Sequence, residues 1–252
     1  MSDAITPPAP SEKSPSAHLE HAPPAHPERS RGTGFHVAHH FSSAEVQFDA
    51  NKMGVWLFLV TEVLLFGGMF CAFAVFRSWY FPAFVAGHDL LSKAAGSTNT
   101  AVLITSSLTM ALAVRSAQMN RKGLTLGFLV ATLLFAATFL VIKYFEYHEH
   151  WASGELPGAL FGHPYMNLKL SNPALAHPLR GESLFFMTYF VMTGIHAVHV
   201  LVGMGLITWM LVRTSKGQFS SRYYSPLENV GLYWHLVDII WIFLFPLLYL
   251  IG

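Results

Sequence analysis

A glutamate lies in the middle of a long apolar segment, ten residues after Lys52. If Lys52 marks one membrane surface, Glu62 is about 15 Å deep, near the centre of a hydrocarbon core about 30 Å thick. An ionised side chain at that depth costs several kcal/mol unless it is paired, so this carboxyl group is a candidate functional site. A neutral carboxylic acid that is bonded to a facing histidine or backbone carbonyl is the less costly state.

Three histidines and two further acidic residues recur at helical spacing in other apolar segments. His196 and His199 are three residues apart and therefore share a helix face. The same spacing relates His235 to Asp238, and Glu228 lies on that face seven residues before His235. Counted from the ends of their segments, the histidines and Asp238 lie in the same band around the membrane midplane as the glutamate.

Three kinds of chemistry fit this polar band. Metal or haem ligation would need histidines that face each other from two helices. A proton-conducting chain is a second possibility, and a hydrogen-bond network that ties the helices together is the third and favoured one. Because their depths match, we expect Glu62 to pair with His196, so that changing either alone destabilises the protein more than changing both.

A second polar group stands at the end of the third apolar segment. It comprises Lys143 and Glu146, followed by residues 148–150, which are His, Glu and His. Charged residues often gather in this way at a membrane interface, and we expect an interfacial cluster here, although Glu146 could instead anchor the outer loop or a partner. Aromatic residues nearby predict an outer aromatic belt, namely Tyr144, Tyr147, Trp151, Trp79 and Tyr80.

The composition is that of an integral membrane protein. Hydrophobic residues make up 53% of the chain and charged residues only 12%, whereas soluble domains carry about 25% charged residues. The net charge of +1 and the scattered basic residues offer no surface for nucleic acid. Five apolar runs are each long enough to cross a membrane, which predicts an all-α bundle of five transmembrane helices. The expected helices are residues 53–78, 99–119, 124–146, 183–212 and 227–251.

Turn and cap signals separate these helices. Asn99 and Thr100 are expected to cap the second helix, and residues 121–123 to form a tight turn into the third. Residues 80–98 and 147–182 are expected to be loops, because Gly and Pro interrupt them. The single cysteine, Cys71, lies inside a span, where a packing role is expected.

Residues 1–45 are rich in Pro, Ser, Ala and His, which predicts a disordered cytoplasmic tail before a transmembrane domain at 46–252. Ten of the 15 Lys and Arg residues fall on the tail side of the membrane. The positive-inside rule then places the N-terminus in the cytoplasm and the C-terminus outside. The histidines of the tail could buffer protons near the membrane surface, but a plain linker is the favoured interpretation.

Several stretches resemble subunit III of the haem–copper terminal oxidases, and they fall in the order of that family. The first runs from Gly54 to Glu62 and reads Gly-Val-Trp-Leu-Phe-Leu-Val-Thr-Glu. The strongest are Thr-Gly-Ile-His-Ala-Val-His-Val at 193–200 and Leu-Tyr-Trp-His-Leu-Val-Asp-Ile-Ile-Trp-Ile-Phe-Leu-Phe at 232–245. Shorter matches are Asn99-Thr100, Ser106-Ser107 and Glu146-Tyr147.

This resemblance implies a non-catalytic subunit of a proton-pumping cytochrome c oxidase in the bacterial cytoplasmic membrane. Such a subunit binds no haem or copper itself and packs against subunit I, which holds haems and copper, alongside subunit II and further oxidase subunits. It stabilises subunit I and supports proton uptake during aerobic respiratory electron transport. Glu62 falls on the carbodiimide-reactive carboxylate of the family. Bound structural phospholipid is also implied.

The resemblance leaves alternatives open. Longer members have seven spans, and this chain has a polar tail in place of the first two, so one wall of the family's lipid cleft is missing. The long outer loop favours the cytochrome c type over a quinol oxidase, and a nitric-oxide-reductase accessory protein is a more distant option. An independent transporter or proton channel that uses Glu62 and the histidines is a different class. The lack of an internal repeat speaks against that class.

Overall fold

The computed structural model describes residues 44–153, 181–219 and 224–251. All of them belong to one compact unit, Val37–Gly252. The expected disordered tail lies outside the described residues except for its last two, which begin the first helix. Most of the expected outer loop at 147–182 lies outside them as well.

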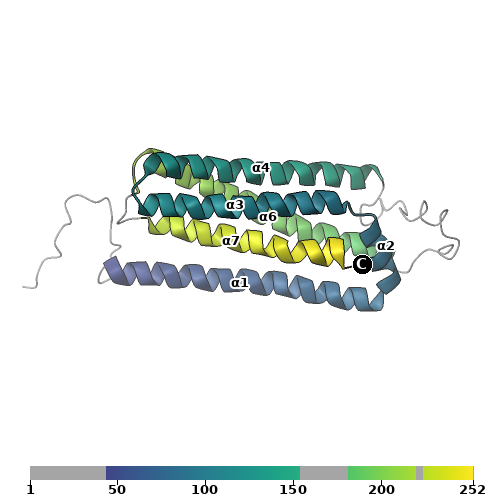
Figure 1. Cartoon of the computed structure of the whole chain (residues 1–252). Coiled ribbons are helices and arrows are strands. Elements are labelled where there is room, and N and C mark those ends of the chain that lie inside the picture. Colours follow the sequence, from purple (N-terminus) through teal and green to yellow (C-terminus); the bar gives the residue numbers. More distant parts are fainter. Residues whose placement is uncertain (1–43, 154–180, 220–223, 252) are drawn as a thin grey trace, which may run out of the picture. The chain divides into compact units, whose positions relative to one another are not determined.

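Every described element is a helix (Figure 1). The elements are α1 (Ala44–Trp79), α2 (Phe81–Asp89), α3 (Lys93–Gln118), α4 (Lys122–Ala152), α6 (Glu182–Ser215), α7 (Ser225–Phe245) and the π-helical turn η2 (Pro246–Leu250). Five helices are long and apolar enough to cross a membrane. The five-helix fold class is therefore confirmed, and the orientation of the termini stays a prediction.

The predicted start of the second span was wrong. α3 begins at Lys93, and its cap is Ser92, whose hydroxyl accepts a hydrogen bond from the backbone N–H of Ala95 at 3.3 Å. Asn99 is instead fully buried within the helix. The polar run before it looked like a loop, but the Ser97 and Thr98 hydroxyls bond backbone carbonyls one turn back, which satisfies them inside a helix.

The short helix α2 corrects the expected loop at 80–98. Pro82 stands in its first turn, where the missing N–H of proline is harmless. Phe84 and His88 of this helix are buried. Phe84 meets Phe185 of α6 edge to face, and Nδ1 of His88 is 3.3 Å from the carbonyl oxygen of Leu248 in η2. The segment Phe81–Asp89 is therefore a helix that packs against α6 and η2, and not a loop.

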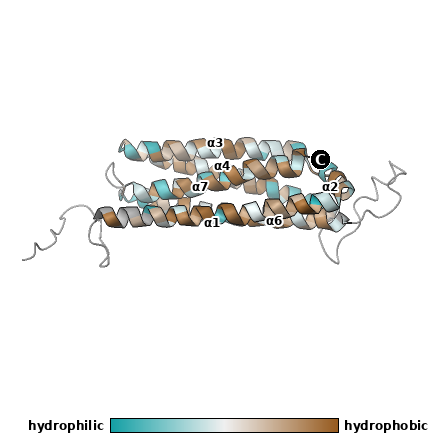
Figure 2. Ribbon diagram, turned by 90° about the horizontal axis from the view of Figure 1, so that it is seen from below, coloured by the Kyte–Doolittle hydropathy of each residue, from teal (hydrophilic) through white to brown (hydrophobic). Residues whose placement is uncertain are grey.

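Four helices make the core, and α1 lies beside them. α3, α4, α6 and α7 form a ring in which each helix packs on two neighbours, whereas α1 touches α6 and α7 with fewer contacts. Figure 1 shows α1 along one edge of the bundle. Hydrophobic residues run along the lengths of the helices (Figure 2), as expected for surfaces that face lipid or other membrane helices. The largest fully buried side chains include Trp234 and Trp241 of α7 and Phe139 of α4.

One glycine decides how closely α6 and α7 approach. A Cβ atom at Gly203 would lie 2.7 Å from ring atoms of Trp234. Only a residue without a side chain lets the Trp234 indole pack this closely on the α6 backbone. Small residues at helix–helix contacts are typical of membrane bundles, because they bring backbones close together.

Candidate functional site: polar groups inside the bundle

Glu62 of α1 is bonded to His199 of α6. Nε2 of His199 lies 2.8 Å from Oε2 of Glu62, and its Nδ1 lies 2.8 Å from the carbonyl oxygen of Ile195. A carbonyl oxygen only accepts, so Nδ1 must carry a proton. The Glu62 contact then holds one proton, either on the carboxyl group of a neutral pair or on the imidazole of an ion pair. In both cases the pair carries no net charge, which suits its place within a membrane span.

The predicted partner of Glu62 was therefore wrong. His196 is fully buried, and its ring centroid lies 6.5 Å from that of Phe66, 5.6 Å from that of Phe139 and 5.3 Å from that of Trp241. Neither ring nitrogen has a hydrogen-bond partner among the described residues. Counting residues along the helix predicted how deep His196 lies in the membrane, but not the direction in which its side chain points. Its side chain points into the four-helix ring, whereas α1 lies outside that ring.

Lys143 and Glu146 form a buried cluster, which corrects the expected interfacial one. They are only 5% and 4% exposed, and Nζ of Lys143 lies 3.0 Å from Oε2 of Glu146. Nζ also donates to the Tyr249 hydroxyl at 2.7 Å and to the Tyr189 hydroxyl at 3.2 Å. Both tyrosines in turn donate to Oε1 of Glu146. The cluster therefore joins α4, α6 and the C-terminal turn η2.

Aromatic rings enclose the ammonium group of this cluster. Nζ of Lys143 lies between 4.8 and 5.8 Å from the ring centroids of Trp241, Tyr189, Tyr249 and Tyr147. Cation–π attraction and hydrogen bonds together offset the cost of burying this charge. The expected aromatic belt is present only in part: Tyr144, Trp79 and Trp151 are exposed, while the Tyr147 hydroxyl is hydrogen-bonded to Thr193 at 2.6 Å.

A third polar group ties α3 to α7. Nδ1 of His235 lies 2.6 Å from the Ser107 hydroxyl. Asp238 is 2% exposed, and neither of its carboxyl oxygens has a hydrogen bond to the described residues. Glu228, in the first turn of α7, is partly exposed and has no side-chain hydrogen bond to the described part of the chain.

Two tryptophans strengthen the same helix pair. Trp234 donates its indole N–H to the Ser106 hydroxyl at 3.0 Å, and Trp241 donates to Thr100 at 3.1 Å. With the Ser107–His235 bond, they connect α3 and α7 over about two turns. The partners Ser107, Tyr189 and Tyr249 had not been predicted. Tyr189 lies seven residues before His196, and this helical spacing was the available signal.

The polar groups do not form one continuous path among the described residues. The ring of Phe66, a residue of α1, lies 6.5 Å from the His196 ring, and the Trp241 ring lies 5.3 Å from the His196 ring and 4.8 Å from Nζ of Lys143. Aromatic rings rather than hydrogen-bonding groups therefore stand next to His196. The described part of the chain also holds no group of three or more His, Cys, Asp or Glu side chains placed to bind a metal ion. The described polar groups are thus arranged mainly as separate hydrogen-bonded groups, an arrangement that agrees with the hypothesis of a structural network.

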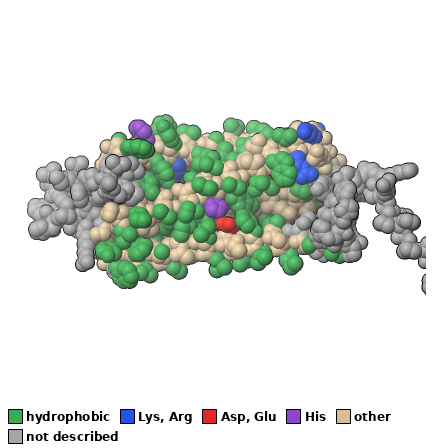
Figure 3. All heavy atoms as spheres, turned by 180° about the vertical axis from the view of Figure 1, so that it is seen from behind, with side chains coloured by type: hydrophobic (Ala, Val, Ile, Leu, Met, Phe, Trp, Pro, Cys, Tyr) green, Lys and Arg blue, Asp and Glu red, His purple; other side chains and the backbone are tan. Residues whose placement is uncertain are grey.

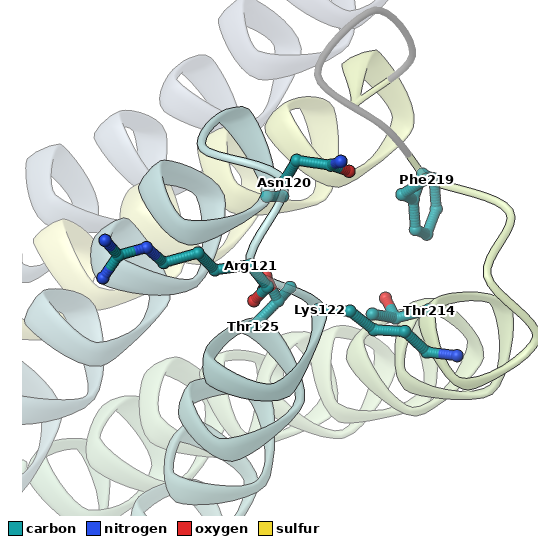
Figure 4. A pocket seen from close by; sticks show the side chains of 7 residues that line it. Asn120, Arg121, Lys122, Thr125, Thr214 and Phe219 are labelled. Atoms are coloured by element: carbon teal, nitrogen blue, oxygen red, sulfur yellow. The ribbon is translucent and has the colours of Figure 1, made fainter.

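A small pocket lies at the opposite end of the bundle, beside the turn between α3 and α4 (Figure 4). Asn120 turns the chain there with a φ of 57°, and α4 follows at Lys122, close to the expected tight turn. Lys122 donates to the carbonyl oxygen of Ser215 at the end of α6 at 2.7 Å. A lysine at a helix C-terminus is favourable for the helix dipole. This contact ties the α3–α4 turn to α6.

Fold and polar groups thus define a class: a membrane protein of five spans whose inner polar groups are mostly paired across helices. Comparison with known proteins identifies the family. A family model for cytochrome c oxidase subunit III matches residues 176–252. The cytochrome bo(3) ubiquinol oxidase subunit 3 of Pseudomonas aeruginosa is 30% identical over 221 residues, which cover 86% of this chain and 92% of that protein. The chain belongs to the haem–copper oxidase subunit III family.

Two further relatives broaden this picture. The cytochrome c oxidase subunit 3 of Loxodonta africana is 28% identical over 211 residues, or 81% of this chain and 70% of that protein. The heme-copper oxidase subunit I+III of Aeropyrum pernix is 30% identical over 209 residues, or 81% of this chain. This chain spans only 23% of the length of that fused protein. The relatives thus include subunits of both cytochrome c and quinol oxidases.

Proposed function

We propose that this chain is the non-catalytic subunit III of a proton-pumping cytochrome c oxidase in the bacterial cytoplasmic membrane. It stabilises the catalytic subunit I and supports proton uptake, with its N-terminus in the cytoplasm. Haem and copper belong to partner subunits, subunit I among them, and structural phospholipid packs against the helices of this chain. The observation that carries the proposal is the match of residues 176–252 to the family model of cytochrome c oxidase subunit III, together with the similarity to a cytochrome c oxidase subunit 3 over 81% of the chain.

The arrangement of polar groups supports a stabilising role. The Lys143–Glu146 cluster and the Glu62–His199 pair are bonded within the chain. Groups that are committed to such bonds hold helices in place and are poorly available for a reaction. A relative that carries subunits I and III in one polypeptide supports direct contact between this chain and subunit I.

A quinol oxidase is the second candidate, and one specific observation favours it. The chain covers 92% of the ubiquinol oxidase subunit of Pseudomonas aeruginosa but only 70% of the longer cytochrome c oxidase subunit of Loxodonta africana. The length of this chain therefore matches that of the quinol-type relative better. The donor itself acts on other subunits, so a measurement on the whole complex must decide.

The test is purification through a tag on this chain in mild detergent, followed by a reduced-minus-oxidised spectrum. Haem bands that co-purify are expected, and oxygen consumption with reduced cytochrome c, but not with quinol alone, assigns the donor. Turnover with quinol alone would replace the first candidate by the second. A folded chain that emerges alone and colourless would overturn both, and would favour an independent transporter.

A further inference from the structure

Two fully buried polar side chains of the four-helix ring have no hydrogen-bond partner in the described part of the chain. They are Asn99 of α3 and His196 of α6. The amide oxygen and nitrogen of Asn99 and both ring nitrogens of His196 are unbonded among the described residues. Buried polar atoms in folded proteins nearly always have a partner. These four atoms therefore require a partner that the described side chains and backbone do not supply.

The two side chains come from helices on opposite sides of the ring. α3 packs on α4 and α7, and α6 packs on the same two helices, so α3 and α6 lie diagonally across the ring. Asn99 stands between Gly96 and Leu103 in the buried stripe of α3. His196 stands one turn before Val200 in the buried stripe of α6. Both side chains therefore belong to the helix faces that line the interior of the ring.

A tryptophan shows that the two residues lie at the same height along the bundle. The indole N–H of Trp241 on α7 donates to the hydroxyl of Thr100, the residue after Asn99, at 3.1 Å. The Trp241 ring centroid also lies 5.3 Å from that of His196. Trp241 thus contacts the turn of α3 that carries Asn99 and, on the other side, the His196 ring itself.

Helix α4 gives the same height independently. The Thr109 hydroxyl of α3 lies 2.8 Å from the Thr132 hydroxyl of α4, and the two helices run antiparallel because a short turn joins them. Asn99, ten residues before Thr109, is therefore level with position 142, ten residues after Thr132. The His196 ring lies 5.6 Å from that of Phe139, which is within one turn of that position. Asn99 and His196 therefore occupy one layer of the ring.

The unpaired buried atoms are concentrated near this layer. Asp238 is the third residue whose buried side-chain atoms lack a hydrogen bond among the described residues, and it lies about one turn before Trp241 on α7. The polar pair on the surface of the bundle is different. Figure 3 shows one acidic side chain beside a histidine in the middle of an otherwise apolar face. Glu62 and His199 are 14% and 18% exposed, and they are bonded to each other at 2.8 Å.

The chemistry of the two side chains fits water better than an ion. An amide offers a donor and an acceptor, and so does a neutral imidazole. Water also donates and accepts, and a buried water typically makes about three hydrogen bonds to otherwise unsatisfied groups. A bound cation would be repelled by Lys143, whose Nζ lies 4.8 Å from the Trp241 ring. Because Lys143 is already paired with Glu146 at 3.0 Å, it has no charge left to hold an anion.

We propose that an ordered internal water lies between Asn99 and His196 and hydrogen-bonds to both. This water ties α3 to α6, the two helices of the ring that do not pack on each other. Asp238, one turn away along α7, is outside this bridge. The site is built from residues of this chain alone, so the inference goes beyond the proposed function and does not depend on it.

A cryo-EM map of the intact complex tests the site. The complex is purified through a tag on this chain and embedded in lipid, and the map must resolve other buried waters of the same spans. A density peak within about 2.7–3.2 Å of a side-chain atom of Asn99 and of a ring nitrogen of His196 is expected. A direct bond between the two side chains, a bond from either to another protein group, or the absence of a peak would overturn the proposal.

Substitutions test whether the two side chains share one partner. Asn99→Leu and His196→Phe each remove the hydrogen-bonding atoms and keep a side chain of similar bulk. Each should shorten the half-life of the folded chain in the heated complex at least about fivefold, and the double variant should stay within about twofold of the worse single one. The reason is that either change alone already removes the shared water. Asn99→Ser should restore most of the half-life, because its hydroxyl bonds water but is too short to reach His196.

Thr214 provides the matched control. It is a buried polar residue of α6, 18 residues after His196, and its hydroxyl bonds its own helix at 2.7 Å. The effects of Asn99→Leu and Thr214→Val on the half-life should multiply, because distant sites act independently. If the effects of Asn99→Leu and His196→Phe multiply as well, the two residues share no water and the proposal is wrong.

The outcome for the proposed function is read separately. A chain that purifies without a haem-bearing partner would refute that function. The map, then recorded with an antibody fragment bound to the chain, and the half-lives would still decide the water site. If haem co-purifies and no peak lies between Asn99 and His196, the proposed function stands and the water site is wrong.

Discussion

His199 holds Glu62 through the one ring nitrogen that Ile195 leaves available. Nδ1 donates to Ile195, and Nε2 meets the Glu62 carboxyl group at 2.8 Å. The Tyr233 hydroxyl also donates to the carbonyl oxygen of His199 at 3.0 Å. Through this pair, α1 gains a polar attachment to a ring of helices on which it otherwise packs sparsely. Loss of this pair is therefore expected to change the position of α1 more than the packing of the four-helix core.

Removing one member of this pair should cost more than removing both. Glu62→Leu leaves His199 without its partner, and His199→Phe leaves the carboxyl group alone, so each single change should lower stability. In a double-mutant cycle on thermal unfolding in detergent, we expect a coupling energy of about 1–2 kcal/mol. Glu62→Gln should be milder, because its amide still donates to Nε2.

The same cycle with His196→Phe provides the control. Because His196 is bonded to neither Glu62 nor any other described residue, its effect should add to that of Glu62→Leu within about 0.5 kcal/mol. Coupling to His196 without coupling to His199 would restore the pairing that depth alone had predicted and contradict the geometry.

The Lys143–Glu146 cluster should be sensitive to single changes. Lys143→Met leaves a buried carboxylate with only tyrosine partners, and an uncompensated buried charge typically costs about 3–5 kcal/mol. The double change Lys143→Met with Glu146→Leu should cost less than Lys143→Met alone. Thermal unfolding of the purified complex measures both.

Exposed neighbours on α4 calibrate this result. His148 and Glu149 lie one and two residues beyond Tyr147 and face outward, so His148→Ala and Glu149→Gln should stay within about 0.5 kcal/mol. A Lys143→Met variant as stable as these controls would mean that the buried pair is not charged in the folded protein.

A buried serine offers a third prediction. Ser106 accepts the indole N–H of Trp234, and both residues are fully buried. Ser106→Ala leaves that N–H unpaired, which should cost about 1–3 kcal/mol. Thr138→Ala, whose exposed hydroxyl bonds only its own helix, is the control in the same unfolding assay. Equal stability of the two variants would show that the Trp234 bond contributes little.

The sequence alone predicted the five spans because each run of apolar residues is long enough to cross a membrane. It did not predict which way the polar side chains point. Lys143, Glu146 and His150 follow Phe139 at spacings of three and four residues on the buried face of α4. That periodicity is present in the sequence, but charged residues near a helix end are more often interfacial, so the sequence alone favours an interfacial cluster.

Partner choice was harder still to predict. Whether Glu62 meets His196 or His199 depends on the rotation of α6 about its axis, and that rotation is set by packing across the whole ring. The contacts of Gly203 with Trp234 and of His196 with Phe139 restrict this rotation. Tyr249 donates to Glu146 from the π-helical turn Pro246–Leu250, and no local sequence pattern predicted that turn.

Gly203 gives the sharpest test of that packing. Gly203→Ala would place a Cβ atom 2.7 Å from the Trp234 ring, and overpacking of a well-filled core typically costs about 1–3 kcal/mol. Gly205, two residues further along α6, has nothing within 4 Å of its Cβ position, so Gly205→Ala should be neutral or stabilising. The two substitutions lie two residues apart on the same helix, and thermal unfolding compares the stabilities of the two variants directly. A Gly203→Ala protein as stable as the Gly205→Ala protein would contradict the close approach of α6 and α7. It would also contradict the rotation of α6 that places His199 against Glu62.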